Sequence, residues 1–197
     1  MRTVIIVGKG DTSREFPEWL ERLPDAEVWR LNDDARWPEA RCDRMYQLHE
    51  GADGAPVDCD FLRVVHPDKR VLGRGEVRLD VEAALTYTDG RERWTDTVCW
   101  MLTDVAREVD IGCVKMLGCD LLATRLERGW ELPGLMWWLG WIERDGVDVY
   151  IPEGSALAQR MGYPGDVGLA RDGRRERRRK EEGRSGGFYE CGGFDNG

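Results

Sequence analysis

The sequence predicts an α/β fold in which a mostly parallel sheet carries helices on both faces. Short, continuous runs of apolar and β-branched residues are typical of strands buried on both faces, and they alternate with segments whose apolar residues recur at helical spacing. Short turns rich in Gly, Pro, Asn and Asp separate these segments. Such alternation is typical of a Rossmann-like sheet, which binds ligands outside the carboxyl ends of its strands.

The chain is predicted to form one domain and a tail. Its 197 residues, of which 41% are hydrophobic, are enough for one domain with its own core, and we predict this domain over residues 1–165. The composition then changes to Arg, Lys, Glu and Gly without apolar periodicity. Residues 166–197 are therefore predicted to be a charged, glycine-rich tail.

The first half of the domain is predicted to contain four strands and one short helix. An apolar, β-branched run at 3–7 ends at Gly8 and marks the first strand. Apolar residues at helical spacing predict a helix over 15–22, which stops before Pro24. Further strands are predicted at 26–31, 44–48 and 61–65, and each is followed by polar residues.

The second half continues the alternation. An apolar stripe predicts a helix over 97–109, followed by a strand at 113–117. A second helix, marked by Leu135, Trp138, Leu139 and Ile142, ends at Gly146 before a strand at 147–151. The helical spacing of Trp138 and Trp141 favours a place in the core or an interface, and a platform for a sugar or base is the alternative.

The charge distribution limits the classes of partner. The net charge is −9, although residues 171–197 carry eight basic groups against six acidic ones, so the body is more acidic than the whole. An acidic body argues against a broad contact with nucleic-acid phosphates, which leaves only the tail for such a partner. With no long apolar run and six scattered cysteines, we expect no membrane contact, reduced thiols and a cytoplasmic location.

The turn after the first strand is the leading candidate for nucleotide binding. It reads Gly8-Lys9-Gly10-Asp11-Thr12-Ser13. Glycines allow a close approach of the backbone to a ligand, and we expect the N–H groups of the turn to face outward and bind a phosphate. The turn lacks the third glycine of the dinucleotide-binding motif and the Gly-Lys-Ser/Thr of a P-loop. A tight strand-to-helix turn without a ligand is the alternative.

Four polar residues follow other predicted strands. Asn32 is placed to contact a ribose or a base, and Asp120 is a candidate for contact with ribose hydroxyls or for accepting a proton. His49 is a candidate for ligand contact or proton transfer, and Ser155 for donation to a phosphate. The alternatives are a turn-forming Asn, a helix-capping Asp, an ordinary edge histidine and a helix-capping Ser.

A zinc site is the other constellation to consider. Cys42, His49, Cys59 and His66 provide suitable ligand types, but their C-x6-H-x9-C-x6-H spacing lacks the short paired turns of zinc sites. We therefore predict no metal site.

Five segments together resemble the nucleotide-sugar-binding core of the bacterial sialyltransferases of glycosyltransferase family 42, and a group of phage and prophage proteins with the same layout. These segments are 4–10, 28–32, 95–101, 114–120 and 149–155, and the resemblance spans about residues 3–158. Gly8, Gly10, Asn32, Gly118 and Asp120 match the family pattern, while Thr95 and Thr97 stand near its helix start. The resemblance implies that these residues surround a cytidine nucleotide.

The chain also departs from that family. The catalytic histidine of the family lies after the strand that ends in Asp120, and this chain has no histidine after His66. We therefore expect a nucleotide- or nucleotide-sugar-binding relative of phage-type glycosyltransferases, with Asp120 or His49 as the base and no tightly bound cofactor. The alternatives are a phage protein that sequesters a nucleotide without chemistry, and an interaction protein that acts through its basic tail. A homo-oligomer is compatible with each of these functions. For a phage-encoded chain, the expected location is the cytoplasm of the host cell.

Overall fold

The computed structural model describes residues 1–32, 41–49, 51, 53–90, 94–120, 131–155 and 157–158. The chain divides into two compact units, Met1–Gly165 and Asp166–Gly197, and every described residue belongs to the first. The predicted tail lies outside the described residues.

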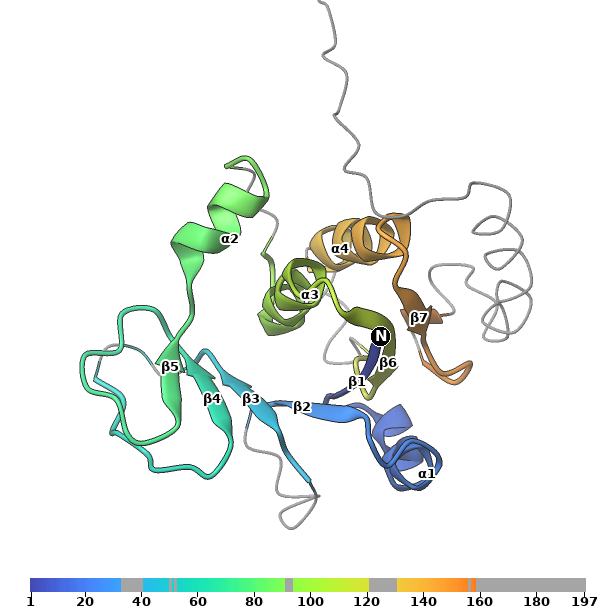
Figure 1. Cartoon of the computed structure of the whole chain (residues 1–197), viewed down its shortest axis with the longest axis horizontal. Coiled ribbons are helices and arrows are strands. Elements are labelled where there is room, and N and C mark those ends of the chain that lie inside the picture. Colours follow the sequence, from blue (N-terminus) through green and yellow to red (C-terminus); the bar gives the residue numbers. More distant parts are fainter. Residues whose placement is uncertain are drawn as a thin grey trace, which may run out of the picture. The chain divides into compact units, whose positions relative to one another are not determined.

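Seven strands form one sheet, and all neighbouring pairs are parallel. This confirms the predicted α/β class with its parallel sheet. The spatial order is β5-β4-β3-β2-β1-β6-β7 (Figure 1). The strands are β1 (Arg2–Val7), β2 (Glu27–Leu31), β3 (Arg44–Gln47), β4 (Leu62–Val65), β5 (Glu76–Arg78), β6 (Ile111–Leu117) and β7 (Asp148–Tyr150).

The direction in which strands are added reverses beside β1. From β1 to β5 the chain adds strands toward one edge, and it then returns to place β6 on the other side of β1. The helical segments that follow β1 and β6 consequently pack against different core clusters. In an open α/β sheet such a switch point forms the crevice in which ligands bind.

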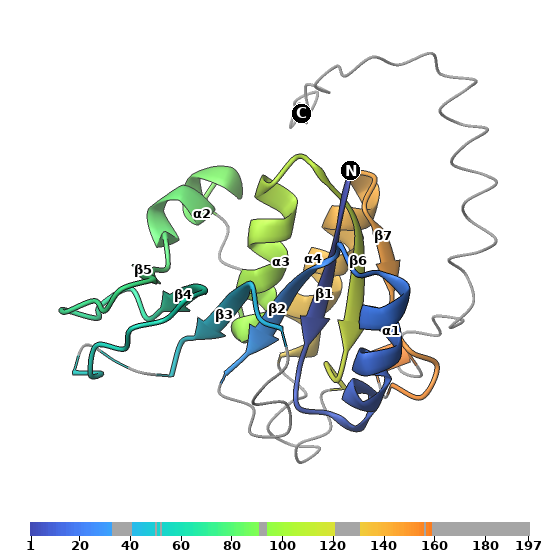
Figure 2. The same cartoon turned by 60° about the horizontal axis from the view of Figure 1, so that its bottom comes forward.

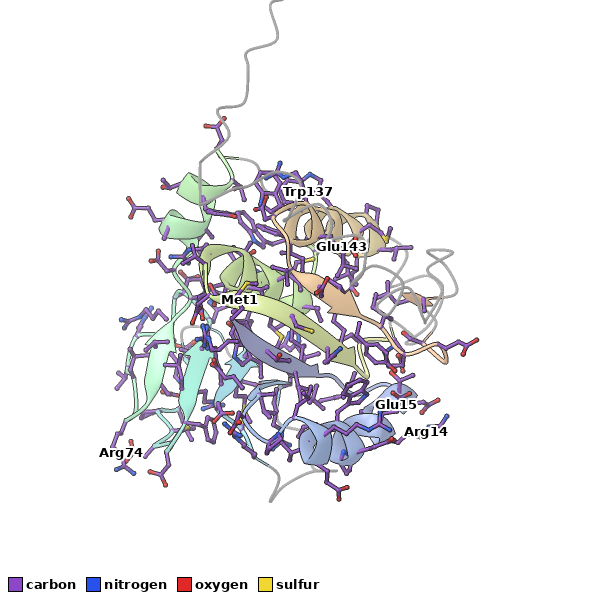
Figure 3. The ribbon with its side chains drawn as sticks, turned by 45° about the vertical axis from the view of Figure 1, so that its right-hand side comes forward. Met1, Arg14, Glu15, Arg74, Trp137 and Glu143 are labelled. Atoms are coloured by element: carbon purple, nitrogen blue, oxygen red, sulfur yellow. The ribbon has the colours of Figure 1, made fainter. Side chains whose placement is uncertain are left out.

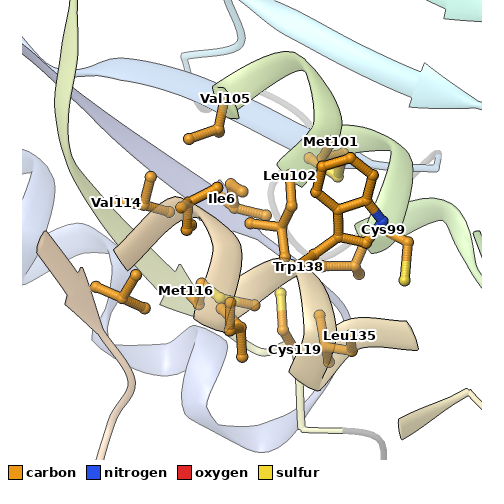
Figure 4. Close-up of a cluster of buried hydrophobic side chains, with 14 of the residues drawn as sticks. Ile6, Cys99, Met101, Leu102, Val105, Val114, Met116, Cys119, Leu135 and Trp138 are labelled. Atoms are coloured by element: carbon orange, nitrogen blue, oxygen red, sulfur yellow. The ribbon is translucent and has the colours of Figure 1, made fainter. Parts of the chain in front are cut away.

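Helices cover both faces of the sheet, as predicted (Figure 2). On one face, η1 (Asp11–Glu15) and α1 (Phe16–Arg22) bring Phe16 against Ile5, Val7, Val28 and Leu117. On the other face, α3 (Thr97–Arg107) and α4 (Leu132–Arg144) form the larger core, in which Met101, Leu102, Leu135 and Trp138 are buried (Figure 4). The core assignment of Trp138 is thereby confirmed.

Several predicted boundaries differ from the observed ones. The helix expected over 15–22 is preceded by a turn of 3-10 helix, and α1 begins at Phe16 with a proline in its first turn. Two elements were not predicted: the edge strand β5, and α2 (Val81–Tyr87), whose first turn is capped by the Asp80 carboxylate accepting from the Ala83 N–H at 2.9 Å.

Candidate functional site

A cavity of about 810 Å³ opens along the carboxyl edge of the sheet, and we call it the carboxyl-edge cavity. The loops after β1, β2 and β3 contribute Lys9, Gly10, Asn32, Leu48 and His49. The loops after β4 and β6 contribute His66, Pro67, Gly118, Cys119 and Asp120, and the start of α3 closes one side. The cavity therefore lies at the switch point and has the volume of a pocket for a small organic molecule.

The turn over residues 8–13 uses most of its amides inside the protein. The N–H groups of Gly8 and Gly10 donate to the carbonyls of Leu117 and Gly118, at 2.7 and 2.8 Å. Those of Thr12 and Ser13 donate to the Asp120 carboxylate and the Gly10 carbonyl, at 3.0 and 3.1 Å. The prediction that the amides of the turn face outward to bind a phosphate is therefore wrong for these four, because they donate to the end of β6, to the loop after β6 and to the turn itself.

The turn lies so close to the loop after β6 that its glycines are required. A Cβ atom on Gly8 would collide with the Gly118 carbonyl oxygen, and one on Gly10 would collide with the Asp120 carboxylate. Gly118 itself has φ +68°, and its Cβ would lie 2.7 Å from the Gly8 carbonyl oxygen. The two loops thus pack backbone against backbone, and the tight-turn alternative accounts for the glycines.

Asp120 is a buried side chain, 2% exposed, and it connects the two loops. Its Oδ2 accepts from the Thr12 N–H and its Oδ1 from the Thr12 hydroxyl, at 3.0 and 2.6 Å. The same hydroxyl accepts from the Gly118 N–H at 2.9 Å. Asp120 lines the cavity, and its carboxylate accepts from an amide in the first turn of η1, while the segment that it could cap as a helix N-cap lies outside the described residues.

The two histidines lie together and apart from the cysteines. His49 follows β3 and His66 follows β4, and both line the cavity. Cys42 and Cys59 precede the same two parallel strands and line a separate, open depression. The four residues of the zinc pattern are thus divided between opposite ends of β3 and β4.

The start of α3 forms one wall of the cavity. Asp96 is its N-cap and accepts from the Cys99 N–H at 2.8 Å, while Thr97 opens the helix. Thr95 donates its hydroxyl to the Glu131 carbonyl at 2.7 Å and so joins this start to α4. Thr95 and Thr97, expected from the resemblance, both line the cavity.

An aromatic pair that the sequence analysis missed belongs to the same wall. The rings of Trp94 and Trp100 stack with centroids 4.3 Å apart and an interplanar angle of 3°. The indole N–H of Trp94 donates to the Thr103 hydroxyl at 2.6 Å, which holds the pair on α3. Both rings line the cavity. Trp94 precedes the helix and Trp100 lies within it, so their spacing does not follow the helical period. The one signal in the sequence that could have indicated them is the presence of two tryptophans near a predicted helix start.

Asn32 has a strained backbone at the end of β2. Its φ is +54°, in the left-handed region, and its N–H donates to the Tyr46 carbonyl at 2.9 Å. Its buried Oδ1 has no hydrogen-bond partner in the part of the chain that the structure describes, and the residue lines the cavity. This oxygen can accept a hydrogen bond from a ligand.

Four predicted site residues do not line the cavity. Within the turn, Gly8 and Ser13 are buried and Asp11 is exposed. Ser155 is buried, and its Oγ accepts from the Leu157 N–H at 3.2 Å, which is the capping alternative. The predicted residues that the cavity does bring together are Lys9, Gly10, Asn32, His49, Thr95, Thr97, Gly118 and Asp120.

The thiol in the cavity is a poor nucleophile. Burial raises the pKa of Cys119 well above its usual range, and the Asp120 carboxylate raises it further. Burial likewise raises the pKa of Cys99 to about 12. At neutral pH Cys119 therefore acts as a small apolar group. Among the described residues, the other ionisable side chains that line the cavity are Lys9, the two histidines, Asp96, Asp120 and Glu131.

Three findings bear on the nature of the site. Among the described residues, no group of three or more His, Cys, Asp or Glu side chains is arranged to hold a metal ion. None of the described helices has the length and apolar character of a membrane span. Comparison of the chain with protein-family models, with curated proteins and with solved structures finds no match.

Proposed function

We propose that the chain binds a nucleotide or a nucleotide sugar in the carboxyl-edge cavity. The observation that carries this proposal is the position of the cavity. It lies at the switch point between β1 and β6, where open α/β sheets bind such ligands, and it combines an aromatic wall with a few polar groups.

The lining suits the three parts of a nucleotide. The Trp94–Trp100 pair and the apolar side chains of Leu31, Leu48 and Leu79 suit a base. Asn32 Oδ1 is an acceptor for a ribose hydroxyl or an amino group. Lys9, which is exposed at the end of β1, is the one lysine or arginine among the described residues that line the cavity. We assign the phosphate to it, in place of the turn amides.

Chemistry at this site would rest on His49. Group transfer from a nucleotide sugar needs a base for the acceptor hydroxyl, and His49 lines the cavity, is exposed and has no ring hydrogen bond among the described residues. The contacts of Asp120 with Thr12 favour a second candidate function, which is nucleotide binding without turnover. Release of free nucleotide from a bound nucleotide sugar, lost on His49→Ala, would support transfer over sequestration.

A thermal-shift panel of CMP, UDP, GDP, NAD and the corresponding nucleotide sugars tests binding. A nucleotide at 100 times its Kd stabilises the folded state by about 2.7 kcal/mol, a rise in Tm of roughly 5–10 °C for a domain of this size. If no compound raises the Tm, the proposed function is wrong.

A matched pair of variants tests the phosphate position. Lys9→Gln removes the ammonium group in the cavity, and we expect it to weaken nucleotide binding by about tenfold or more. Arg14→Gln removes a charge from an exposed residue of η1 that does not line the cavity, and it should bind as the wild type does (Figure 3). Equal binding by both variants would remove Lys9 from the phosphate site.

A further inference from the structure

His66 lies on a turn that is held in place on both sides. It follows Val65, the fully buried last residue of β4, and the Lys69 N–H donates to the His66 carbonyl at 3.1 Å. Pro67, at the second position, restricts the backbone of this turn. The turn ends at Lys69, which is 0% exposed.

The side chain of Lys69 anchors the turn. Its ammonium group donates to Glu76 Oε1 at 2.8 Å and to the Ala55 carbonyl at 2.7 Å. The Arg63 guanidinium donates to the same Glu76 oxygen at 2.7 Å, and both Arg63 and Glu76 are buried. Buried charges persist when they are paired and hydrogen-bonded. This group ties the turn after β4 to the strands β4 and β5.

One hydrogen bond fixes the state of the His66 ring. The Asp68 N–H donates to His66 Nδ1 at 3.2 Å. A nitrogen that accepts a hydrogen bond carries no proton, so the neutral ring carries its proton on Nε2. The Asp68 carboxylate lies 3.7 Å from the same nitrogen and is 75% exposed.

We propose that His66 is a specificity-determining residue of the carboxyl-edge cavity. The turn holds its ring as the neutral Nε2–H tautomer, and this N–H donates to an acceptor oxygen of the bound nucleotide, either on the phosphate or on the base. The proposal rests on the proposed nucleotide-binding function. It adds a preorganised donor at the end of β4, and it gives the buried Lys69 group a positioning role.

Because the chain has two histidines, the protonation of the His66 ring nitrogens can be compared with that of His49. Ring ¹⁵N spectra of the full-length chain contain two imidazole systems, and His49→Gln assigns them. At a pH where both rings are neutral, we expect His66 to show a non-protonated Nδ1 and a protonated Nε2, in Asp68→Asn as well as in the wild type, because the substitution keeps the Asp68 amide. A His66 ring protonated on Nδ1 would overturn the proposal.

Binding by two isosteric variants tests the donor. The Gln side chain places an amide N–H near the position of Nε2, whereas Asn reaches only to that of Nδ1. With CMP as the probe, we expect His66→Gln to bind within about threefold of the wild type and His66→Asn to bind about tenfold more weakly. Circular dichroism and the Tm without nucleotide verify that both variants fold.

Two further probes locate the acceptor. If His66→Asn binds cytidine more weakly than the wild type does, the acceptor lies on the base. If His66→Asn binds CMP and inorganic phosphate more weakly but cytidine equally well, the acceptor lies on the phosphate. Wild-type levels of CMP binding by His66→Asn would overturn the proposal while leaving nucleotide binding intact. If the wild-type chain binds none of the three probes and no compound of the nucleotide panel, the proposed function fails, and the ligand role of His66 fails with it.

Discussion

The carboxylate of Asp120 accepts two hydrogen bonds from one residue, Thr12, through its N–H at 3.0 Å and its hydroxyl at 2.6 Å. The two residues are 108 positions apart in the sequence, and the contact joins the loops that follow β1 and β6. Both side chains are buried. This contact holds Asp120, which lines the carboxyl-edge cavity, in place.

Removing the hydroxyl of Thr12 should destabilise the fold. Thr12→Val leaves Asp120 Oδ1 and the Gly118 N–H without their partner in a buried site, and we expect a loss of about 2–4 kcal/mol in the free energy of unfolding. Thr12→Ser keeps the hydroxyl and should stay within about 1 kcal/mol of the wild type. Urea denaturation measures both. Equal stability of the two variants would contradict the role given to this contact.

Two glycine-to-alanine substitutions should have opposite effects. Gly10→Ala places a methyl group against the Asp120 carboxylate and should cost about 2 kcal/mol or more. Gly140 is an exposed residue within α4, and its Cβ would meet no atom within 4 Å. Gly140→Ala should therefore stabilise the chain by up to about 1 kcal/mol through helix propensity. Thermal unfolding reports both signs, and a neutral Gly10→Ala would refute the close packing of the two loops.

The buried Glu76 should make the fold sensitive to acid. Burial raises the pKa of this carboxyl, but hydrogen bonds from the Gly73 N–H, the Lys69 ammonium and the Val57 N–H outweigh it and lower the pKa to about 2. Because this value lies below the ordinary 4.5, ionised Glu76 stabilises the fold above about pH 4.5, and this contribution is lost as the pH falls toward 2.

Glu76→Gln tests this sensitivity. We expect a loss of about 3 kcal/mol or more at pH 7, since Lys69 and Arg63 lose their shared carboxylate, and a smaller further loss between pH 4.5 and 2 than in the wild type. Glu18→Gln breaks an exposed pair with Arg22 and should change stability by less than about 0.5 kcal/mol. Denaturation curves across this pH range give the comparison. Parallel pH profiles for Glu76→Gln and the wild type would contradict the assignment.

The aromatic wall should contribute to nucleotide affinity. Trp100→Ala removes one ring of the stacked pair, and we expect CMP to bind roughly tenfold or more weakly, because stacking on an aromatic ring contributes about 1–3 kcal/mol per base. Trp137 is a half-buried tryptophan of α4 that does not line the cavity (Figure 3). Trp137→Ala is the matched control and should bind CMP as the wild type does in isothermal titration. An unchanged affinity in Trp100→Ala would remove the base from this wall.

Much of the fold could be predicted because its signals are local. The strands β1, β2, β3, β4 and β6 are short apolar runs, and their observed ends lie within two residues of the predicted ones. β5 was missed because its three residues include two charged side chains and show no alternation of apolar and polar positions. Glu76 is nevertheless buried in the fold, where it pairs with Lys69 and Arg63.

The candidate site was predictable in position and only partly in detail. Polar residues after parallel strands pointed to the carboxyl edge of the sheet, and His49, Asn32 and Asp120 do line one cavity there. The partners of the turn amides were not predictable, since Leu117, Gly118 and Asp120 are distant in the sequence. The state of the His66 ring depends on the conformation of one turn, to which residue types alone do not point.

The most direct test of nucleotide binding in the carboxyl-edge cavity is a titration of the full-length chain with CMP, followed by the ring signals of its two histidines. Both rings line the cavity, and the chain has no other histidine. We expect both sets of signals to shift together and to saturate with one Kd that agrees with calorimetry. Calorimetric binding without a shift of either ring, or no binding by any compound of the nucleotide panel, would contradict the account.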